Sequence, residues 1–292
     1  MILKFKPILL EKVWGGTKLG QLYNVQSDKI GECWGISGHK SNSNILDDNG
    51  RFKGMTLREL YTTNKELFGN YKSDEFPILI KYIDAEKDLS IQVHPDDKYA
   101  KKHEKSKGKE ECWFILESKK DTKIIIGNSA SSKNDILESI KSGKILEKMN
   151  SYKIRTNDYF YIPSGTIHAI CSDTFLLEVS QSSDITYRLY DYNRLDKGKL
   201  RDLHINKSLD VIRIPDIELI KAHQNKYFTF EVFNHKGTKA VIADQYGDYI
   251  SILDGEGYLG NYPVKSGEFY MVTSKAEYII EGNIKYHLSK LV

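Results

Sequence analysis

The hydrophobic positions of this chain fall mainly in short runs with a period of two, which predicts β-strands. Gly, Asn and Asp residues interrupt the runs, as they do at turns. The runs cover residues 76–83, 89–94, 112–116, 122–126, 159–162, 175–179, 227–234, 239–243, 249–253, 255–259, 268–272 and 278–281. Many short strands with turn signals between them predict a mainly β protein, built as a barrel or a sandwich.

Helical patterns are few. Thr56 and Glu59 form a capping-box sequence before an apolar stretch, and residues 135–142, 144–149 and 206–212 have helical spacing. A boundary is expected near Pro215. We therefore predict a first domain over residues 1–215, with a small helical insertion at about 131–150, and a smaller β-rich domain over residues 216–292.

Four potential metal ligands come from three separate strand-like segments, residues 90–95, 109–116 and 162–170. They are Gln92 and His94, Glu111, and His168. Residues two apart on a strand face the same way, so Ser90, Gln92 and His94 would share one face. Two imidazoles, a carboxylate and an amide oxygen suit a borderline divalent cation such as zinc, and can leave positions open for substrate.

The metal interpretation competes with a simpler one for each ligand. Taken alone, Gln92 and His94 fit a pair of hydrogen-bonded residues on an exposed face. His168 changes the balance because Pro163 and Gly165 can form a tight turn that brings the next strand back with His168 pointing inward. Buried polar groups without partners are costly, and metal ligation would supply the partners.

Several cationic residues could bind an anionic substrate. Lys81 lies within an apolar run, Lys109 lies two positions before Glu111, and Arg188 lies in a stretch rich in hydroxyl and charged groups. Arg188 could hold a phosphate or an enediolate through two hydrogen bonds. Taken alone, Arg194 is better explained as a surface cation than as a substrate-binding residue. For Lys81 the two interpretations are equally open.

Composition limits the possible functions. The 292 residues carry a net charge of only +3, and no basic stripe argues for nucleic acid. No run approaches the roughly 20 apolar residues of a membrane span, and no signal peptide is evident at the start. Three scattered cysteines do not suggest a disulfide framework. We expect a cytoplasmic protein that acts as a monomer or homodimer on a small molecule.

These motifs resemble those of a known family. Pro163-x-Gly165-x-x-His168 resembles the second motif of the cupin superfamily, and Gln92-x-His94 with Glu111 resembles its first motif with one His replaced by Gln. That replacement is typical of the type I mannose-6-phosphate isomerases, here in their short bacterial form. The resemblance extends over residues 14–16, 31–34, 76–81 and 178–194. It implies two cupin-type jelly-roll barrels, one for each predicted domain.

The resemblance also implies an activity and a set of site residues. The family interconverts mannose 6-phosphate and fructose 6-phosphate with a divalent metal, usually zinc. The implied metal ligands are Gln92, His94, Glu111 and His168. The implied catalytic residues are Arg188, Lys109 and Glu32. The predicted substrate-binding residues are Lys81, Ser90, Trp14 and Arg194.

The expected reaction moves a proton between C1 and C2 of the sugar through a cis-enediol. This requires a base and a group that stabilises the oxyanion, for which Arg188 is the candidate. The sequence does not distinguish Glu32, Lys109 and a metal-bound water as the proton carrier. Arg194 and hydroxyl side chains are candidates for holding the phosphate.

Two alternatives fit the same motifs. Two His and one carboxylate also suit a non-heme iron oxygenase of the cupin type, although Gln92 as a fourth ligand argues against it. A non-catalytic sugar-binding cupin is the other alternative, and it would need neither a metal nor a pocket of basic residues.

Overall fold

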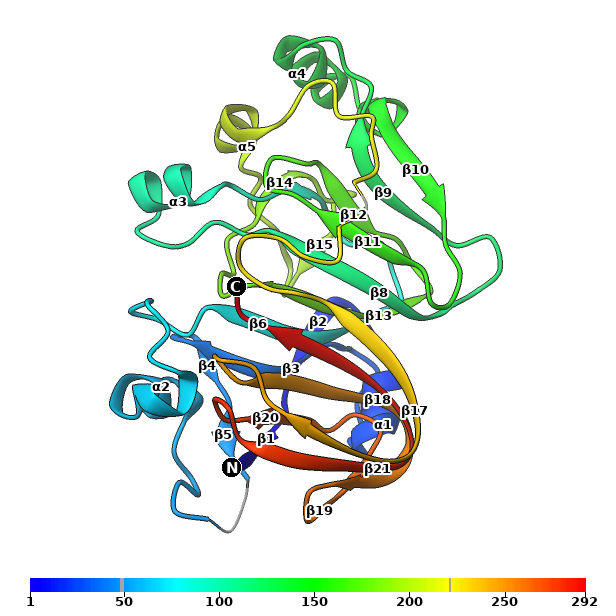
Figure 1. Ribbon diagram of the computed structural model, residues 1–292. Helices are drawn as coiled ribbons and strands as arrows, with labels where there is room; N and C mark the ends of the chain where they lie inside the picture. The colour runs from blue at the N-terminus through cyan, green and yellow to red at the C-terminus, as the bar shows by residue number, and fades with distance from the viewer. Residues whose placement is uncertain (48–49, 221) are drawn as a thin grey trace.

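The computed structural model describes residues 1–47, 50–220 and 222–292, and antiparallel sheets make up most of it (Figure 1). The central sheet has the strand order β11-β8-β13-β6-β2-β3-β4. Its strands are Tyr159–Ile162 (β11), Glu111–Ser118 (β8), Thr174–Gln181 (β13), Ile78–Ala85 (β6), Ile8–Gly16 (β2), Ile30–His39 (β3) and Asn42–Ser43 (β4). The expectation of a mainly β protein is confirmed.

A five-stranded sheet packs over part of the central sheet. Its order is β10-β9-β12-β7-β14, which places β14 at an edge. The strands are Met149–Lys153 (β10), Lys123–Asn128 (β9), His168–Ile170 (β12), Ile91–Val93 (β7) and Tyr187–Tyr190 (β14). A small hairpin of Leu195–Asp196 (β15) and Lys199–Leu200 (β16) follows β14 in the chain.

The third sheet joins the two ends of the chain, and we call it the C-terminal sheet. Its order is β17-β21-β18-β20-β1-β5, with β19 paired to β18. The strands are Glu231–Ile242 (β17), Glu277–Lys290 (β21), Asp248–Leu259 (β18), Phe269–Val272 (β20), Ile2–Lys6 (β1), Ile45–Leu46 (β5) and Tyr262–Lys265 (β19). Because β1 pairs with β20, this sheet draws strands from both sides of residue 215. The division into two domains at that residue stays a prediction.

Short helices surround the sheets. They are Lys18–Tyr23 (α1), Leu57–Thr63 (α2), Asp97–His103 (α3), Lys133–Lys141 (α4) and Ile205–Val211 (α5), with 3₁₀ turns at Lys65–Phe68 (η1) and Ile145–Lys148 (η2). The capping box forms at α2, where the side chain of Thr56 accepts from the backbone N–H of Glu59. Figure 1 places α3, α4 and α5 beside the five-stranded sheet, away from the C-terminal sheet.

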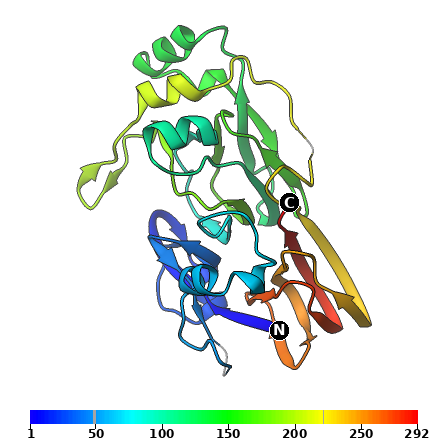
Figure 2. The ribbon, with the colours of Figure 1, turned by 60° about the vertical axis from the view of Figure 1, so that its left-hand side comes forward.

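The alternation of side chains along β6 explains how the layers stack. Ile78, Ile80 and Tyr82 face one side and belong to a core shared with the C-terminal sheet. Lys81 and Ile83 face the other side and line a pocket toward the five-stranded sheet. The central sheet therefore separates a mainly apolar layer from a layer that contains a row of charged groups. Figure 2 shows the N- and C-terminal ends on the same part of the molecule, the part that holds the C-terminal sheet.

Candidate active site

The four predicted metal ligands lie on strands of the two sheets that face each other. Gln92 is on β7, and it is directly paired with His168, the first residue of β12. His94 follows β7, and Glu111 is the first residue of β8 in the central sheet. Adjacent strands lie only about 5 Å apart. The fold therefore brings side chains from three separate segments together.

A glycine turn places His168. Gly165 has a φ of +83°, the left-handed region that favours glycine, and the N–H of Thr166 donates to the carbonyl of Pro163 at 3.2 Å. A Cβ at position 165 would lie 2.8 Å from the carbonyl oxygen of Val211. The turn therefore needs glycine for its conformation and for the space around it.

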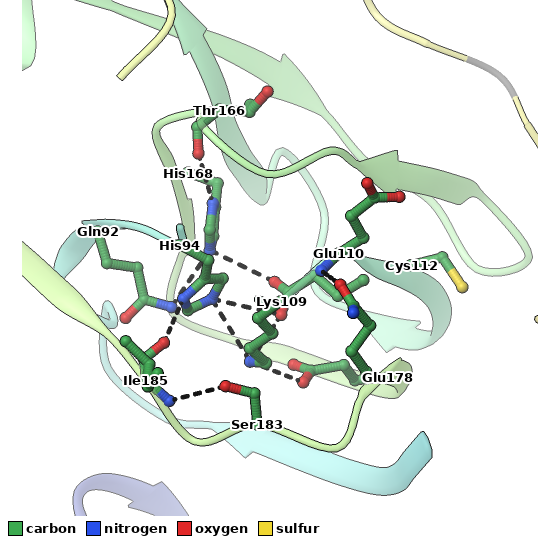
Figure 3. A network of polar contacts seen from close by, with 12 residues as sticks. Gln92, His94, Lys109, Glu110, Cys112, Thr166, His168, Glu178, Ser183 and Ile185 are labelled. Atoms are coloured by element: carbon green, nitrogen blue, oxygen red, sulfur yellow. Dashed lines mark hydrogen bonds and ion pairs between the residues drawn. The ribbon is translucent and has the colours of Figure 1, made fainter. Parts of the chain in front are cut away.

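Three of the four ligands converge closely (Figure 3). One ligand atom each from His94, Glu111 and His168 lies within 4.8 Å of the other two, and all three side chains are buried. Nε2 of His94 is 3.4 Å from Oε2 of Glu111, and Nε2 of His168 is 3.3 Å from Oε1. The amide nitrogen of Gln92 is 3.3 Å from Nε2 of His168, which puts the fourth residue beside the other three.

Backbone carbonyls orient both imidazoles. Nδ1 of His94 is 2.7 Å from the carbonyl oxygen of Ile185, and Nδ1 of His168 is 2.9 Å from that of Thr166. Because a carbonyl only accepts, each Nδ1 carries the proton. Burial and the Lys109 ammonium lower the pKa of His94 to about 3, and burial lowers that of His168, so both rings are neutral. Each Nε2 therefore offers a lone pair, as metal-ligating histidines do.

The carboxylate of Glu111 is the best indication that a cation belongs here. Both of its oxygens are buried, and each faces an unprotonated imidazole nitrogen. Oε2 has the Lys109 ammonium 2.7 Å away, but Oε1 has no hydrogen-bond partner among the described residues. Two facing lone pairs repel each other unless a cation lies between them. Burial raises the pKa of Glu111, but its charged neighbours, above all the Lys109 ammonium, outweigh that effect and hold the pKa well below its usual range. The residues present thus fit a divalent metal, because they supply one negative charge and two imidazole nitrogens with free lone pairs.

A row of alternating lysines and glutamates runs from this centre along the inner face of the central sheet. The ion pairs in the row are Lys109–Glu111 at 2.7 Å, Lys109–Glu178 at 3.1 Å, Lys81–Glu178 at 3.3 Å, Lys81–Glu32 at 3.4 Å and Lys12–Glu32 at 3.1 Å. Lys81 and Glu178 pair directly across β6 and β13. Each buried charge therefore has an opposite neighbour, which offsets the cost of its burial.

The row fixes the protonation of its members. Burial raises the pKa of Glu32, but Lys81 and Lys12 outweigh that effect and bring it down to about 2, so Glu32 is a carboxylate at neutral pH. Burial lowers the pKa of Lys109, but Glu111 and Glu178 outweigh it and raise the pKa overall. Lys109 is therefore an ammonium that can donate hydrogen bonds.

Arg188 lies on the opposite wall. It pairs with Gln92 across β14 and β7, so His168, Gln92 and Arg188 lie in a line over three adjacent strands. Paired residues on neighbouring strands point to the same face. Burial and the nearby Arg201 lower the pKa of Arg188, and its Nε is buried without a hydrogen-bond partner among the described residues. The guanidinium thus has unused donor capacity close to the ligand set.

One pocket of about 330 Å³ brings these groups together. The predicted residues that line it are Trp14, Glu32, Lys81, Ser90, Gln92, Lys109, Glu111 and Arg188. His94 and His168 are buried behind that surface, 1% exposed each. Arg194 is not among the lining residues, because its guanidinium is bound to the carboxylate of Asp191 and the carbonyl of Asp88.

Comparison with known proteins decides the family. Residues 2–112 match the family model of the phosphomannose isomerase type I catalytic domain. The chain is 39% identical to the mannose-6-phosphate isomerase ManA of Bacillus subtilis, over 98% of each chain. It is 44% identical to the mannose-6-phosphate isomerase of Streptococcus mutans, over 72% of this chain and 68% of that one. The chain belongs to the type I phosphomannose isomerase family.

The fold of this phosphomannose isomerase family member agrees with its sequence. The crystal structure of the mannose 6-phosphate isomerase from Bacillus subtilis superposes with a TM-score of 0.93 at 34% identity, covering 99% of both chains. The cupin-type, mainly β expectation is thereby confirmed, and so is the family resemblance. The membership argues against the oxygenase alternative. No described helix is long and apolar enough to cross a membrane.

Sequence reasoning missed several residues of the phosphomannose isomerase pocket. Glu178 joins two lysines, Arg201 lies beside Arg188, and Lys12 and Trp34 both contact Glu32. Glu178 had a signal, since it is the one charged residue in the apolar run 175–179. Arg201 had no such signal in the sequence. It follows a polar hairpin, and the residue that positions it, Asp191, lies ten positions earlier in the chain.

Proposed function

We propose that this chain interconverts mannose 6-phosphate and fructose 6-phosphate, by moving a proton between C1 and C2 of the open-chain sugar. One observation carries the proposal: a single pocket is lined by a cation-binding set, a buried row of paired lysines and glutamates, and Arg188. Relatives that match over nearly the whole chain have this activity in their names.

The proposed cofactor is one divalent metal ion, Zn²⁺. Gln92, His94, Glu111 and His168 would hold it, and their mixed nitrogen and oxygen donors suit zinc better than a hard cation such as Mg²⁺. When bound, such an ion polarises sugar oxygens and stabilises negative charge at the reacting carbons as a Lewis acid.

The protein's own groups would divide the remaining work. Arg188, placed one strand away from Gln92, would stabilise the negative charge of the enediolate through its free N–H groups. Lys109, held as an ammonium, would donate to a sugar oxygen. Glu32, held as a carboxylate, would accept a proton. Lys81 would keep Glu32 ionised and in place.

The remaining lining residues would position the sugar. Ser90 is 3% exposed, lines the pocket and donates to Oε1 of Gln92 at 3.2 Å. It would therefore hold the side chain of Gln92 in position. Trp14 would provide an apolar wall that excludes water from the reacting carbons, which strengthens every electrostatic interaction there.

The test is a coupled assay for fructose 6-phosphate formed from mannose 6-phosphate by purified protein. We expect activity that a chelator abolishes and that zinc restores. Adding other divalent ions to the chelated protein would rank the metals. Fully metallated protein that produces no fructose 6-phosphate would refute the proposed reaction, and activity that survives complete metal removal would refute the role of the metal.

We further propose that the protein works in the cytoplasm as a monomer or homodimer. Its three cysteines are all free, and two of them are buried in the apolar layer, which suits a reducing compartment. Light scattering on the purified protein would measure the mass in solution, and cell fractionation would measure the location.

A further inference from the structure

Arg201 is a second guanidinium in the pocket. It follows β16, its side chain is only 15% exposed, and it lines the same pocket as Arg188 and the metal ligands. Its Nε donates to Oδ2 of Asp191 at 2.7 Å, and one of its terminal nitrogens donates to Oδ1 of the same carboxylate. This fork-to-fork pairing fixes the plane of the guanidinium and leaves its other terminal nitrogen unused by Asp191.

Asp191 does not neutralise the positive charge around it. The same carboxylate also binds Arg194 at 2.6 Å, so two guanidinium groups share one negative charge, and Arg188 adds a third positive charge nearby. The other acidic group lining this part of the pocket, Asp184, is half exposed and lies beside His39 and Ser41. Asp202 is exposed. Because solvent screens these two exposed carboxylates, the more buried part of the cluster holds three guanidinium groups against one carboxylate, and this favours an anion.

The position of Arg201 relative to the metal ligands matches the shape of a sugar phosphate. His168, Gln92 and Arg188 lie in a line across β12, β7 and β14, and β14 is the edge strand. Asp191, directly after β14, anchors Arg201 at that edge. In a hexose 6-phosphate the reacting carbons C1 and C2 are at one end and the phosphate is at the other. Carbons held at the metal ligands would therefore direct the phosphate toward this edge.

The neighbours of Arg201 in the pocket are also suited to a phosphate. Thr186, Asn42 and Ser183 line the same pocket and offer hydroxyl or amide groups. Arg194, the residue that the sequence suggested for this task, binds the same carboxylate but is not among the residues that line the pocket. We propose that Arg201, held by Asp191, binds the phosphate group of the substrate, and that Arg194 only supports Asp191. The proposal rests on the proposed isomerase function.

The experiment compares Arg201→Gln with Arg194→Gln. Both substitutions remove one ion pair to Asp191, but only the first removes a donor from the pocket. For Arg201→Gln we expect KM for mannose 6-phosphate to rise about 10- to 100-fold, as for a lost hydrogen bond between charged groups, with kcat changed less than about 3-fold. For Arg194→Gln we expect KM to change less than about 3-fold. Arg201→Lys should give an intermediate KM, because it keeps the charge but not the fork.

A binding measurement separates this proposal from the isomerase function. Titration calorimetry with inorganic phosphate should detect binding to the wild-type protein and to Arg194→Gln, and weaker binding by about 10-fold or more to Arg201→Gln. This readout does not need turnover, so it holds even if the protein does not isomerise mannose 6-phosphate. Melting temperatures of both variants show whether each is folded.

Three results would overturn the assignment. An unchanged KM in both Arg201→Gln and Arg201→Lys would remove Arg201 from phosphate binding. Equal increases in KM for Arg201→Gln and Arg194→Gln would show that the effect passes through Asp191 alone. A fall in kcat for Arg201→Gln at unchanged KM and unchanged phosphate binding would assign Arg201 to the chemical step instead.

Discussion

A single hydrogen bond at His168 decides what that ring can do. The carbonyl of Thr166 holds the proton on Nδ1, so Nε2 is left to bind a cation next to Glu111. Ile185 does the same for His94. Both partners are backbone groups, and they are therefore unaffected by most substitutions in the segments that carry them.

Removing His168 should leave the set one nitrogen short. We predict that His168→Ala loses bound metal and activity together. Groups that only hydrogen-bond to the ligands cannot replace a side chain that binds the metal itself. Metal content by mass spectrometry and the coupled assay would measure both. The control is His103→Ala, on the exposed side of α3, which should keep metal and turnover. Full zinc occupancy in His168→Ala would exclude His168 as a ligand.

The ionised form of Glu32 should stabilise the fold at neutral pH. Its pKa falls from 4.5 to about 2 in the folded protein, because Lys81 and Lys12 outweigh burial. A lowered pKa contributes stability above pH 4.5, and the contribution disappears as the pH falls from 4.5 toward 2. We predict that Glu32→Gln is less stable than wild type at pH 7, and that the difference shrinks over this range.

Thermal or urea unfolding of both proteins between pH 7 and pH 2 would measure the difference. Glu138→Gln is the control, since Glu138 makes only an exposed ion pair with Lys141 and should show little effect at any pH. A pH-independent difference between Glu32→Gln and wild type would show that packing, rather than charge, accounts for the loss.

The sequence predicted site residues wherever a local rule applied. The period of two placed Gln92 and His94 on one strand face, and the Pro–Gly turn placed His168. Residues whose role depends on pairing between distant strands had no such rule. Glu178 meets Lys81 only because β13 and β6 are neighbours, and Arg194 and Arg201 both bind Asp191 although only Arg201 lines the pocket. The assignment of roles to all these residues stays a prediction until they are tested.

At the scale of elements, the hydrophobic runs of the sequence located ten of the 21 described strands, missed all five that precede residue 76, and divided some of the long ones. The predicted strands 249–253 and 255–259 form one strand, β18, and residues 278–281 are only the start of β21. Gly237, Gly255 and Gly282 suggested breaks, but each has a positive φ within a continuous strand, and the register of β18 against β21 shifts just before Gly255, between Ile252 and Asp254. Glycine marks a bulge as readily as a turn, and only the partner strand decides which.

The turn before β12 should tolerate no side chain. We predict that Gly165→Ala destabilises the protein by more than the roughly 1–2 kcal/mol of a left-handed alanine, because its Cβ would also meet Val211, and that it weakens metal binding by displacing His168. Gly143→Ala is the matched control. Gly143 has a φ of +71° but nothing within 4 Å of a Cβ, so only the conformational cost applies.

Unfolding by urea and zinc titration of both variants would measure the two effects. Equal destabilisation in Gly165→Ala and Gly143→Ala, with unchanged zinc affinity in both, would mean that the turn can shift without moving His168.

On the scale of the whole molecule, one apolar layer joins the beginning, middle and end of the chain. Phe5, Tyr82, Val179, Tyr249 and Phe269 belong to the same buried cluster. The N-terminal amino group also donates to the hydroxyl of Thr273 at 3.0 Å. The site side of the central sheet therefore depends on residues from the C-terminal sheet that never touch the pocket.

Separate fragments should show this dependence. We predict that residues 1–215 and residues 216–292, produced apart, each lack a cooperative unfolding transition, because β1 loses β20 and the apolar layer loses one wall. Co-expression of both fragments should restore a folded complex. Calorimetry would measure the transitions, and two independent cooperative transitions would instead support the predicted division near residue 215.

The pairing of β1 with β20 also has a consequence for how the protein is made in the cell. Ile2 pairs with Val272, so β1 leaves the ribosome long before the strand that closes its sheet. Until then it exposes Leu3 and Phe5, which are fully buried afterwards. Contacts between such distant residues form slowly, and exposed strand edges invite aggregation in the meantime. The apolar layer behind the pocket is therefore expected to close only once β20 has been made, and the nascent chain depends most on chaperones until then.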